Sequence, residues 1–184
     1  MSEKWPDDRK YDEEAVEAGD FKGLKQVIAA LRGENGCPWD RAQTFSTLKP
    51  CMINEMTEAL AGIDLYQETK DPENLCEELG DVLLQVVLLS QIASEEGLFT
   101  VEDVIRGISR KMIRRHPHVF ADNEEHPRAE EVPGRWDAIK RAEKKNRLPD
   151  QEQREKKAFA KAAEQVMAQL AGVLESCSEN KGNP

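Results

Sequence analysis

Four acidic residues form two pairs, and each pair lies inside a strongly apolar segment of the chain. The pairs are Glu55-x-x-Glu58 and Glu78-x-x-Asp81. Residues three positions apart on an α-helix lie on the same side, one turn apart, so each pair directs two carboxylates the same way. Two antiparallel helices would therefore bring four carboxylates together. Like charges at that distance repel and raise each other's pKa unless a cation lies among them.

A site made only of carboxylates selects a hard divalent cation, so we predict Mg²⁺, with Mn²⁺ as a possible substitute. Acids on helices are usually solvated, but Glu78 and Asp81 interrupt a helix that is otherwise apolar enough to be buried. An unpartnered buried charge costs several kcal/mol. A di-iron centre is the alternative, and it needs Glu-x-x-His on two helices. The three histidines, at 116, 118 and 126, lie outside the predicted helices.

Basic residues follow the acids along the chain. A metal ion held by carboxylates usually retains waters and binds a phosphate-bearing substrate, which needs positive groups as well. Lys111 and Arg115 lie four positions apart on the next predicted helix, and Trp136 and Lys140 lie on the one after it. Basic side chains near a helix C-terminus also complement the helix dipole, and a Trp on an amphipathic helix is commonly part of the core. The residues alone leave these alternatives open.

Helical periodicity covers most of the sequence, and we see no strand pattern. We expect helices over 21–32, from Thr47 to beyond Ile63, over 73–96, over 101–115, from Gly134 and over 151–176, separated by loops at 34–40 and 116–134. The stretch 82–89 is apolar nearly all the way round, which is typical of a central bundle helix. The predicted fold is an all-α antiparallel helical bundle that associates into oligomers.

The 184 residues suit one domain with extensions. We expect an acidic N-terminal lead-in at 1–19, a helical domain at 20–148 that carries the candidate site, and a C-terminal helix with a frayed tail at 149–184. The net charge of −10 disfavours binding to a nucleic acid polymer or an anionic membrane. The N-terminus lacks the apolar core of a signal peptide, so we expect a cytoplasmic protein.

Several motifs in one continuous region resemble the MazG family of nucleoside triphosphate pyrophosphohydrolases. Besides the two acidic pairs, they are ENGCPWDRAQTFSTLKP (34–50), ELGDVLLQVV (78–87), EEGLFTVEDV (95–104), RRHPHVFAD (114–122) and RWDAIKRAEK (135–144). The resemblance covers about residues 21–145. It implies an all-α, magnesium-dependent enzyme that works as a homodimer or a dimer of dimers. It also implies hydrolysis of a nucleoside triphosphate to the monophosphate and pyrophosphate, at the bond between the α and β phosphates.

The resemblance also assigns roles to single residues. Glu55, Glu58, Glu78 and Asp81 match the family's magnesium ligands and are the expected catalytic residues. The expected substrate-binding residues are Lys111 and Arg115, which match its phosphate-binding positions, and Trp136 and Lys140, which match its nucleotide-contacting Trp-x-x-x-Lys.

The sequence departs from the family pattern in two ways. Asn54 stands where the family commonly has a first Glu, which removes one charge near the metal. Many members carry two such domains, whereas this chain has one, whose motifs resemble the first copy.

Two other functions stay open. The chain could be a catalytically weak nucleotide-binding module, or a helical interaction module whose acids hold a structural metal. If it is an enzyme, we expect broad base tolerance, because stacking on Trp136 accepts any base whereas strong discrimination needs buried hydrogen-bonding groups.

Overall fold

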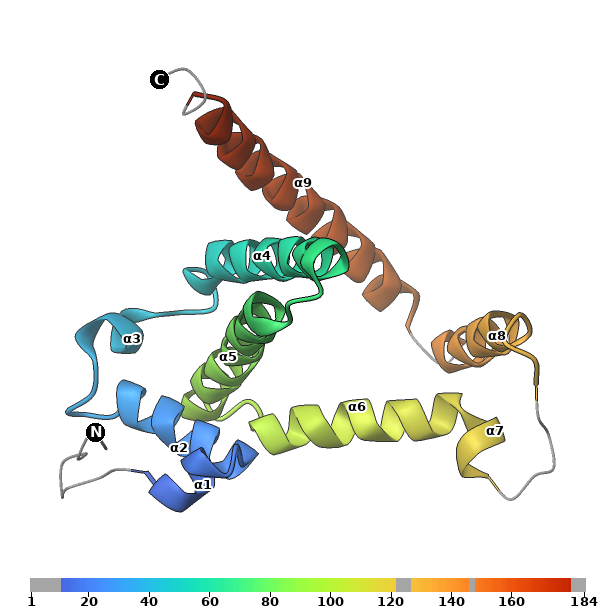
Figure 1. The fold of residues 1–184 in the computed structure, drawn as a ribbon. Coiled ribbons are helices and arrows are strands. Elements are labelled where there is room, and N and C mark those ends of the chain that lie inside the picture. The colour runs from blue at the N-terminus through green and yellow to red at the C-terminus, as the bar shows by residue number, and fades with distance from the viewer. Residues whose placement is uncertain (1–10, 122–126, 146–147, 180–184) are drawn as a thin grey trace. The chain divides into compact units, whose positions relative to one another are not determined.

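The computed structural model describes residues 11–121, 127–145 and 148–179, and every regular element in those ranges is a helix (Figure 1). The predicted all-α class is therefore confirmed, whereas the bundle arrangement and the oligomeric state stay predictions. The chain divides into two compact units, residues 1–102 and 103–184. The first ten residues of the predicted lead-in, residues 122–126 and 146–147 of the predicted domain, and the end of the predicted tail, 180–184, lie outside the described residues.

Five helices build the first unit. They are α1 (Glu13–Glu17), α2 (Phe21–Arg32), α3 (Pro38–Ala42), α4 (Leu48–Thr69) and α5 (Glu73–Glu95). Local sequence explains the ends of α2, since the side chain of Asp20 accepts a hydrogen bond from the backbone of Lys22 and Gly33 follows the last turn. Gly97, whose φ of 69° suits glycine, follows the end of α5 in the same way.

Helices α4 and α5 form an antiparallel hairpin, which is the most extensive helix pair of the structure. Residues 70–72 join them, and the Asp71 side chain accepts a hydrogen bond from the Glu73 backbone at 3.1 Å, which caps α5. Gly62 of α4 packs directly on the backbone of Leu75 of α5. Because the chain reverses between these two residues, the acids of α4 face the acids of α5.

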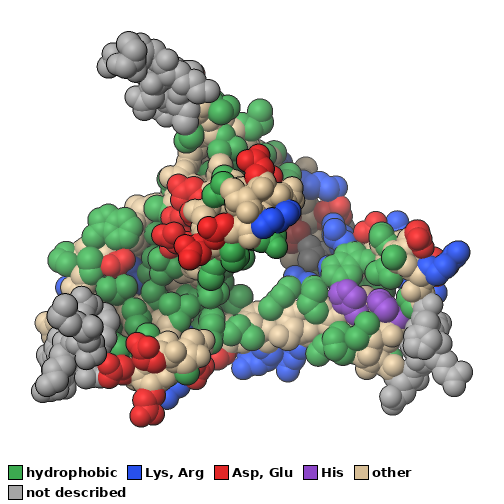
Figure 2. Space-filling view, viewed as in Figure 1, with side chains coloured by type: hydrophobic (Ala, Val, Ile, Leu, Met, Phe, Trp, Pro, Cys, Tyr) green, Lys and Arg blue, Asp and Glu red, His purple; other side chains and the backbone are tan. Residues whose placement is uncertain are grey.

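The hydrophobic core lies at one end of this hairpin. Its buried residues are Ile28 from α2, Leu48 from the start of α4, and Val87, Leu88 and Ile92 from the second half of α5. The predicted burial of residues 82–89 is confirmed only on the side that faces this core. On another side of the stretch Leu83 is 42% exposed, and Figure 2 shows hydrophobic side chains at the surface over α5.

The second unit contains most of α6 (Val101–Arg115), together with α7 (Pro117–Phe120), α8 (Val132–Lys144) and α9 (Pro149–Glu179). Ion pairs link α6 to α8: Arg114 and Arg115 both contact Glu143, each with an N···O distance of 2.6 Å. These pairs connect the two helices that carry the predicted substrate-binding residues.

Short helices are the main local difference from the sequence prediction. The segments predicted as loops at 34–40 and 116–134 contain the start of α3, all of α7 and the first turn of α8. Pro38 and Pro117 each stand at the first helical position, where the fixed φ of proline favours a helix. Part of the predicted lead-in forms α1, whose N-cap Asp12 accepts a hydrogen bond from the Ala15 backbone at 3.2 Å.

Candidate metal centre and substrate site

Three of the four predicted metal ligands converge in the α4–α5 hairpin. Glu55 and Glu58 of α4 and Glu78 of α5 each offer a carboxylate oxygen, and these oxygens all lie within 4.8 Å of one another. Glu55 and Glu78 are half-buried, and Glu58 is exposed. Asp81 is not part of this group of three, but it is half-buried one turn beyond Glu78 on α5. We call these four residues the acidic cluster.

The electrostatics of the acidic cluster are those of uncompensated like charges. Burial raises the pKa of Glu55, and the negative charges of Glu58 and Asp81 raise it further, as does a hydrogen bond with Glu58. The effect of Asp81 on this pKa places it within electrostatic reach of Glu55. A bound cation would remove this repulsion and lower the pKa of Glu55 again.

This donor set fits a hard divalent cation such as Mg²⁺. The three converging ligands are carboxylate oxygens, with a spacing that one ion can bridge, and neither nitrogen nor sulfur is among them. The Glu78 carboxylate accepts a hydrogen bond from the side chain of Asn74, whose role the sequence analysis did not predict. Asn74 is neutral, so it leaves the negative charge of Glu78 in place for a metal.

Gln85 is a polar residue of α5 one turn beyond Asp81. It is only 5% exposed, and its Oε1 atom is buried without a hydrogen-bond partner, the one such side-chain atom found in the described part of the chain. Buried polar groups normally have a partner, so this oxygen marks a position where a water or a ligand group is needed. It lies on the same side of α5 as the acids.

The predicted substrate-binding residues belong to the second unit. The Arg115 guanidinium lies over the Trp136 ring, with its central carbon 5.1 Å from the ring centroid, so the structure brings these two predicted residues together. His116 contacts the same ring edge-on, with centroids 4.9 Å apart. Lys111 and Lys140 are exposed. Whether these four residues meet the acidic cluster at one substrate stays a prediction.

Glu143 is a further residue of this group that the sequence analysis did not single out. It accepts hydrogen bonds from the Arg114 and Arg115 side chains, and these bonds lower the pKa of its carboxyl to about 2. Arg115 is largely buried beside it. The only sequence signal for this contact is an acid on α8 seven positions after Trp136, two turns along the same face.

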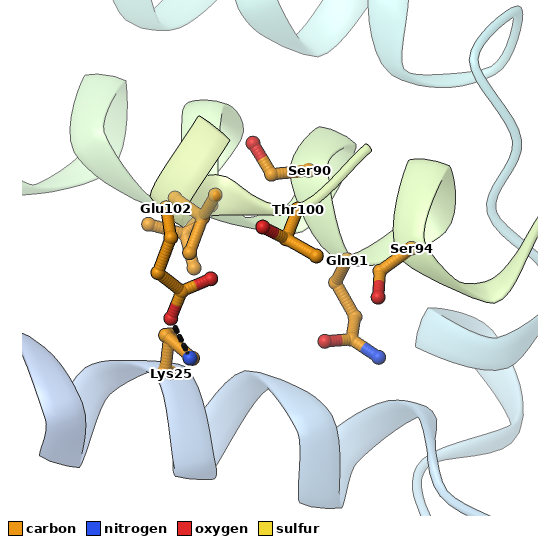
Figure 3. Close-up of a pocket in the computed structure, with 8 residues that line it drawn as sticks. Lys25, Ser90, Gln91, Ser94, Thr100 and Glu102 are labelled. Atoms are coloured by element: carbon orange, nitrogen blue, oxygen red, sulfur yellow. Dashed lines mark hydrogen bonds and ion pairs between the residues drawn. The ribbon is translucent and has the colours of Figure 1, made fainter. Parts of the chain in front are cut away.

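A small polar pocket lies elsewhere in the first unit, between α2, α5 and the start of α6 (Figure 3). Its volume is about 110 Å³, and an ion pair between Lys25 and Glu102 crosses it. Sites for drug-sized ligands typically measure about 300–1,000 Å³, so this pocket is too small for a nucleotide. The acidic cluster remains the candidate site of the first unit.

Comparison with known families identifies the region that contains the acidic cluster. Residues 43–120 match the sequence model of the MazG nucleotide pyrophosphohydrolase domain. The chain contains a MazG domain. The match includes the four acids, Lys111 and Arg115, and ends before Trp136 and Lys140. The MazG domain thus covers all of α4 and α5 and continues through α6 and α7.

Three relatives are similar to the chain well beyond the matched MazG domain. The uncharacterized protein YabN of Bacillus subtilis is 49% identical over 132 residues, which are 72% of this chain and 26% of that protein. The nucleoside triphosphate pyrophosphohydrolase/pyrophosphatase MazG of Thermotoga maritima is 47% identical over 128 residues, 67% of this chain and 45% of that protein. The nucleoside triphosphate pyrophosphohydrolase of Escherichia coli K12 is 46% identical over 122 residues, 66% of this chain and 44% of that protein.

The chain therefore spans less than half the length of each of these relatives. Within the described residues, no helix combines the length and the apolar character that a membrane span requires.

Proposed function

We propose that the MazG domain hydrolyses nucleoside triphosphates to the monophosphate and pyrophosphate in a magnesium-dependent reaction. The observation that carries the proposal is the convergence of Glu55, Glu58 and Glu78 within 4.8 Å, inside a region that matches the MazG nucleotide pyrophosphohydrolase domain. Two of the three relatives described above are named as nucleoside triphosphate pyrophosphohydrolases.

The acidic cluster would hold the metal, with Glu55, Glu58 and Glu78 as ligands and Asp81 as the fourth. A bound Mg²⁺ supplies charge neutralisation, polarisation of a phosphoryl oxygen and a lower pKa of a bound water. The carboxylates would hold the triphosphate through such cations, because a triphosphate and four carboxylates repel each other. One of these carboxylates would accept the proton of the attacking water.

The basic and aromatic residues of the second unit would bind the rest of the substrate. Lys111 and Arg115 would neutralise the negative charge that grows on the departing pyrophosphate. Trp136 would stack on the base and Lys140 would contact the nucleotide. Arg115 already contacts Glu143 and the Trp136 ring, so binding a phosphate would add a third partner to this guanidinium.

Base tolerance should be broad, since the proposed contacts are charges for phosphates and a ring for stacking. The measurement is kcat/KM for the four ribonucleoside triphosphates, their deoxy forms and one deaminated analogue. We expect all values to lie within about a hundredfold, the discrimination that a pocket without base-specific hydrogen bonds can reach. A larger preference for one base would contradict the proposed contacts and would make Gln85 a candidate for a hydrogen bond to that base.

The activity itself is tested by pyrophosphate release from these triphosphates with Mg²⁺, with Mn²⁺ and with a chelator. Release that requires the cation and disappears in the Glu58→Gln variant supports the proposal. Two other outcomes would contradict it. Nucleotide binding without release would indicate a catalytically weak binding module, and metal binding without nucleotide binding would indicate a helical interaction module.

Association into a homodimer or a dimer of dimers is part of the proposed function. The face of α4 formed by Met56, Leu60 and Ile63 is exposed, as are Leu79 and Leu83 of α5. Leu83 also lines an apolar cavity of about 430 Å³ formed with α1 and α2. Apolar surface of this extent is typical of an interaction site, and a second copy of the hairpin would cover it.

A further inference from the structure

The side chain of Asn74 holds one oxygen of a predicted metal ligand. Its Nδ2 atom donates a hydrogen bond of 2.9 Å to Oε1 of Glu78, one helical turn further along α5. Both side chains are half-buried. The bond therefore forms beside the acidic cluster, where it restricts the rotation of the Glu78 carboxylate.

The backbone of α4 closes the other side of this pair. Gly62 is buried, and a Cβ atom at this position would lie 3.2 Å from Oδ1 of Asn74 and 3.5 Å from Cγ of Glu78. A side chain at this position would therefore crowd the Asn74 amide. Gly62 lies beside both the Asn74 amide and the stem of the Glu78 side chain, on the α4 side of this pair.

The chemistry of the amide suits a metal ligand. A Lys or Arg in place of Asn74 would also bind the Glu78 carboxylate, but its positive charge would compete with the cation. A neutral amide donates to one oxygen and leaves the carboxylate charged, with its second oxygen available. Such supporting hydrogen bonds orient metal ligands, and their loss typically costs about 10–100-fold in metal affinity or activity.

We propose that Asn74 is a positioning residue of the metal centre, which holds the Glu78 carboxylate in the orientation that would bind the cation. This inference rests on the metal site of the proposed function. Asn74 itself does not contact the metal or the substrate. Its removal should therefore weaken metal binding without abolishing the chemistry once the metal is bound.

The chain offers a matched control on the same helix. Gln91 donates from Nε2 to Oε1 of Glu95 at 3.0 Å, and donor and acceptor are again four positions apart. This hydrogen bond is exposed and lies nearly five turns beyond Asn74, away from the acidic cluster. Asn74→Ala and Gln91→Ala thus remove the same type of hydrogen bond from α5, and only the first removes it from a predicted metal ligand.

The test is a titration of the full chain with Mn²⁺ in the absence of nucleotide, in which electron paramagnetic resonance measures the bound Mn²⁺. We expect Asn74→Ala to raise the Kd for Mn²⁺ at least about tenfold, and Gln91→Ala to change it less than about twofold. Urea unfolding of both metal-free variants checks that each is folded. In turnover, the Mg²⁺ concentration for half-maximal rate should rise in Asn74→Ala while kcat at saturating Mg²⁺ stays close to the wild-type value.

An Asn74→Ala variant that binds Mn²⁺ like the wild type would overturn the inference and leave the proposed function standing. An equal rise of the Kd for Mn²⁺ in Gln91→Ala would overturn the inference too, because the weaker binding would then reflect a general loss of helix stability. A wild type that binds no Mn²⁺ would contradict the proposed metal centre itself, and the inference with it. Loss of kcat at saturating Mg²⁺ would instead make Asn74 part of the catalytic machinery and contradict a positioning role.

Discussion

Arg32 and Glu95 connect the end of α2 to the end of α5 through a bidentate ion pair. Nη2 of Arg32 lies 2.6 Å from Oε2 of Glu95, and Nε donates to Oε1 at 2.9 Å. The Arg32 side chain is only 7% exposed, and its Nη1 also donates to the backbone carbonyls of Asp40 and Gln43. A single guanidinium thus joins α2, the segment that leads into α4, and α5, which together surround the hydrophobic core.

We expect Arg32→Met to destabilise the first unit by about 1–3 kcal/mol, less than the 3–5 kcal/mol typical of a broken buried pair because Glu95 is partly solvated. The variant leaves two backbone carbonyls and one carboxylate without their donor. Urea unfolding followed by circular dichroism measures the change. Arg154→Met breaks an exposed ion pair with Asp150 on α9 and should cost less than about 0.5 kcal/mol. Equal effects of the two substitutions would contradict a special role for Arg32.

Neutralising one member of the acidic cluster should stabilise the metal-free protein and abolish turnover. Glu58→Gln and Asp81→Asn each remove one of several clustered like charges, which relieves repulsion when no cation is present. Thermal melting with and without Mg²⁺ measures the effect. We expect the wild type to gain Tm on adding Mg²⁺ and the variants to gain much less. A metal-free wild type whose Tm is unaffected by Mg²⁺ would contradict the metal site.

The Glu143 ion pairs should stabilise the protein at neutral pH and lose this effect at acid pH. The pKa of Glu143 is lowered from 4.5 to about 2 by the Arg115 and Arg114 hydrogen bonds. A lowered pKa in the folded state means that the stabilisation is present above the unfolded pKa, near 4.5, and is lost as the pH falls toward 2. The difference in unfolding free energy between the wild type and Glu143→Gln should therefore be largest near neutral pH and shrink below pH 4.5.

Asp137→Asn is the matched control for Glu143→Gln, because it removes the same charge from an exposed position of α8. Its effect on stability should be small at neutral pH. A difference between the wild type and Glu143→Gln that stays constant from pH 7 to pH 3 would show that the ion pairs contribute nothing to folding.

Gln85 and Gln43 are both buried, yet replacing each with Met should change the free energy of unfolding in opposite directions. Gln43 is 9% exposed and paired, since its Nε2 donates to the Trp39 carbonyl at 2.9 Å and its Oε1 accepts from Thr47 at 2.8 Å. The Oε1 atom of Gln85 has no hydrogen-bond partner among the described residues. An unpaired buried polar atom costs about 1–3 kcal/mol, so Gln85→Met should stabilise the ligand-free protein by roughly 1 kcal/mol.

Gln43→Met should instead destabilise the protein by a similar amount, because it leaves two bonded groups without a partner. Urea unfolding without metal or nucleotide measures both changes. If Gln85→Met is destabilising, its amide has a partner in solution, such as a bound water, and the stabilising effect predicted from the unpaired oxygen is wrong.

Local signals account for most of what the sequence predicted. Asp20 and Gly33 mark the ends of α2, and Asp71 marks the start of α5, because capping depends on a few neighbouring residues. The convergence of Glu55, Glu58 and Glu78 also follows from spacing, since a short connection makes two consecutive helices antiparallel. These features need no knowledge of distant contacts.

Tertiary contacts explain what the sequence did not predict. Helices of four or five residues, such as α1 and α7, are too short to show a hydrophobic period, and isolated helices of that length are unstable. The pairing of Arg115 with Glu143, 28 residues apart, depends on how α8 meets α6. The hydrogen bond from Asn74 to Glu78 depends on side-chain conformation and on the close approach of α4 at Gly62, which the sequence does not show.

The exposed apolar face of α4 should make the protein at least a dimer in solution. Leu60 is 60% exposed at the centre of the face that Met56 and Ile63 complete at helical spacing. Leu60→Lys should raise the dissociation constant at least about tenfold, since burying one leucine contributes about 1.5–3 kcal/mol and a buried unpaired lysine costs more. Multi-angle light scattering across a micromolar dilution series measures the mass.

Ala61→Lys places the same charge on an exposed position away from this face and should leave association unchanged. A wild type that is monomeric at micromolar concentration, or an equal loss of association in both variants, would contradict an interface on α4.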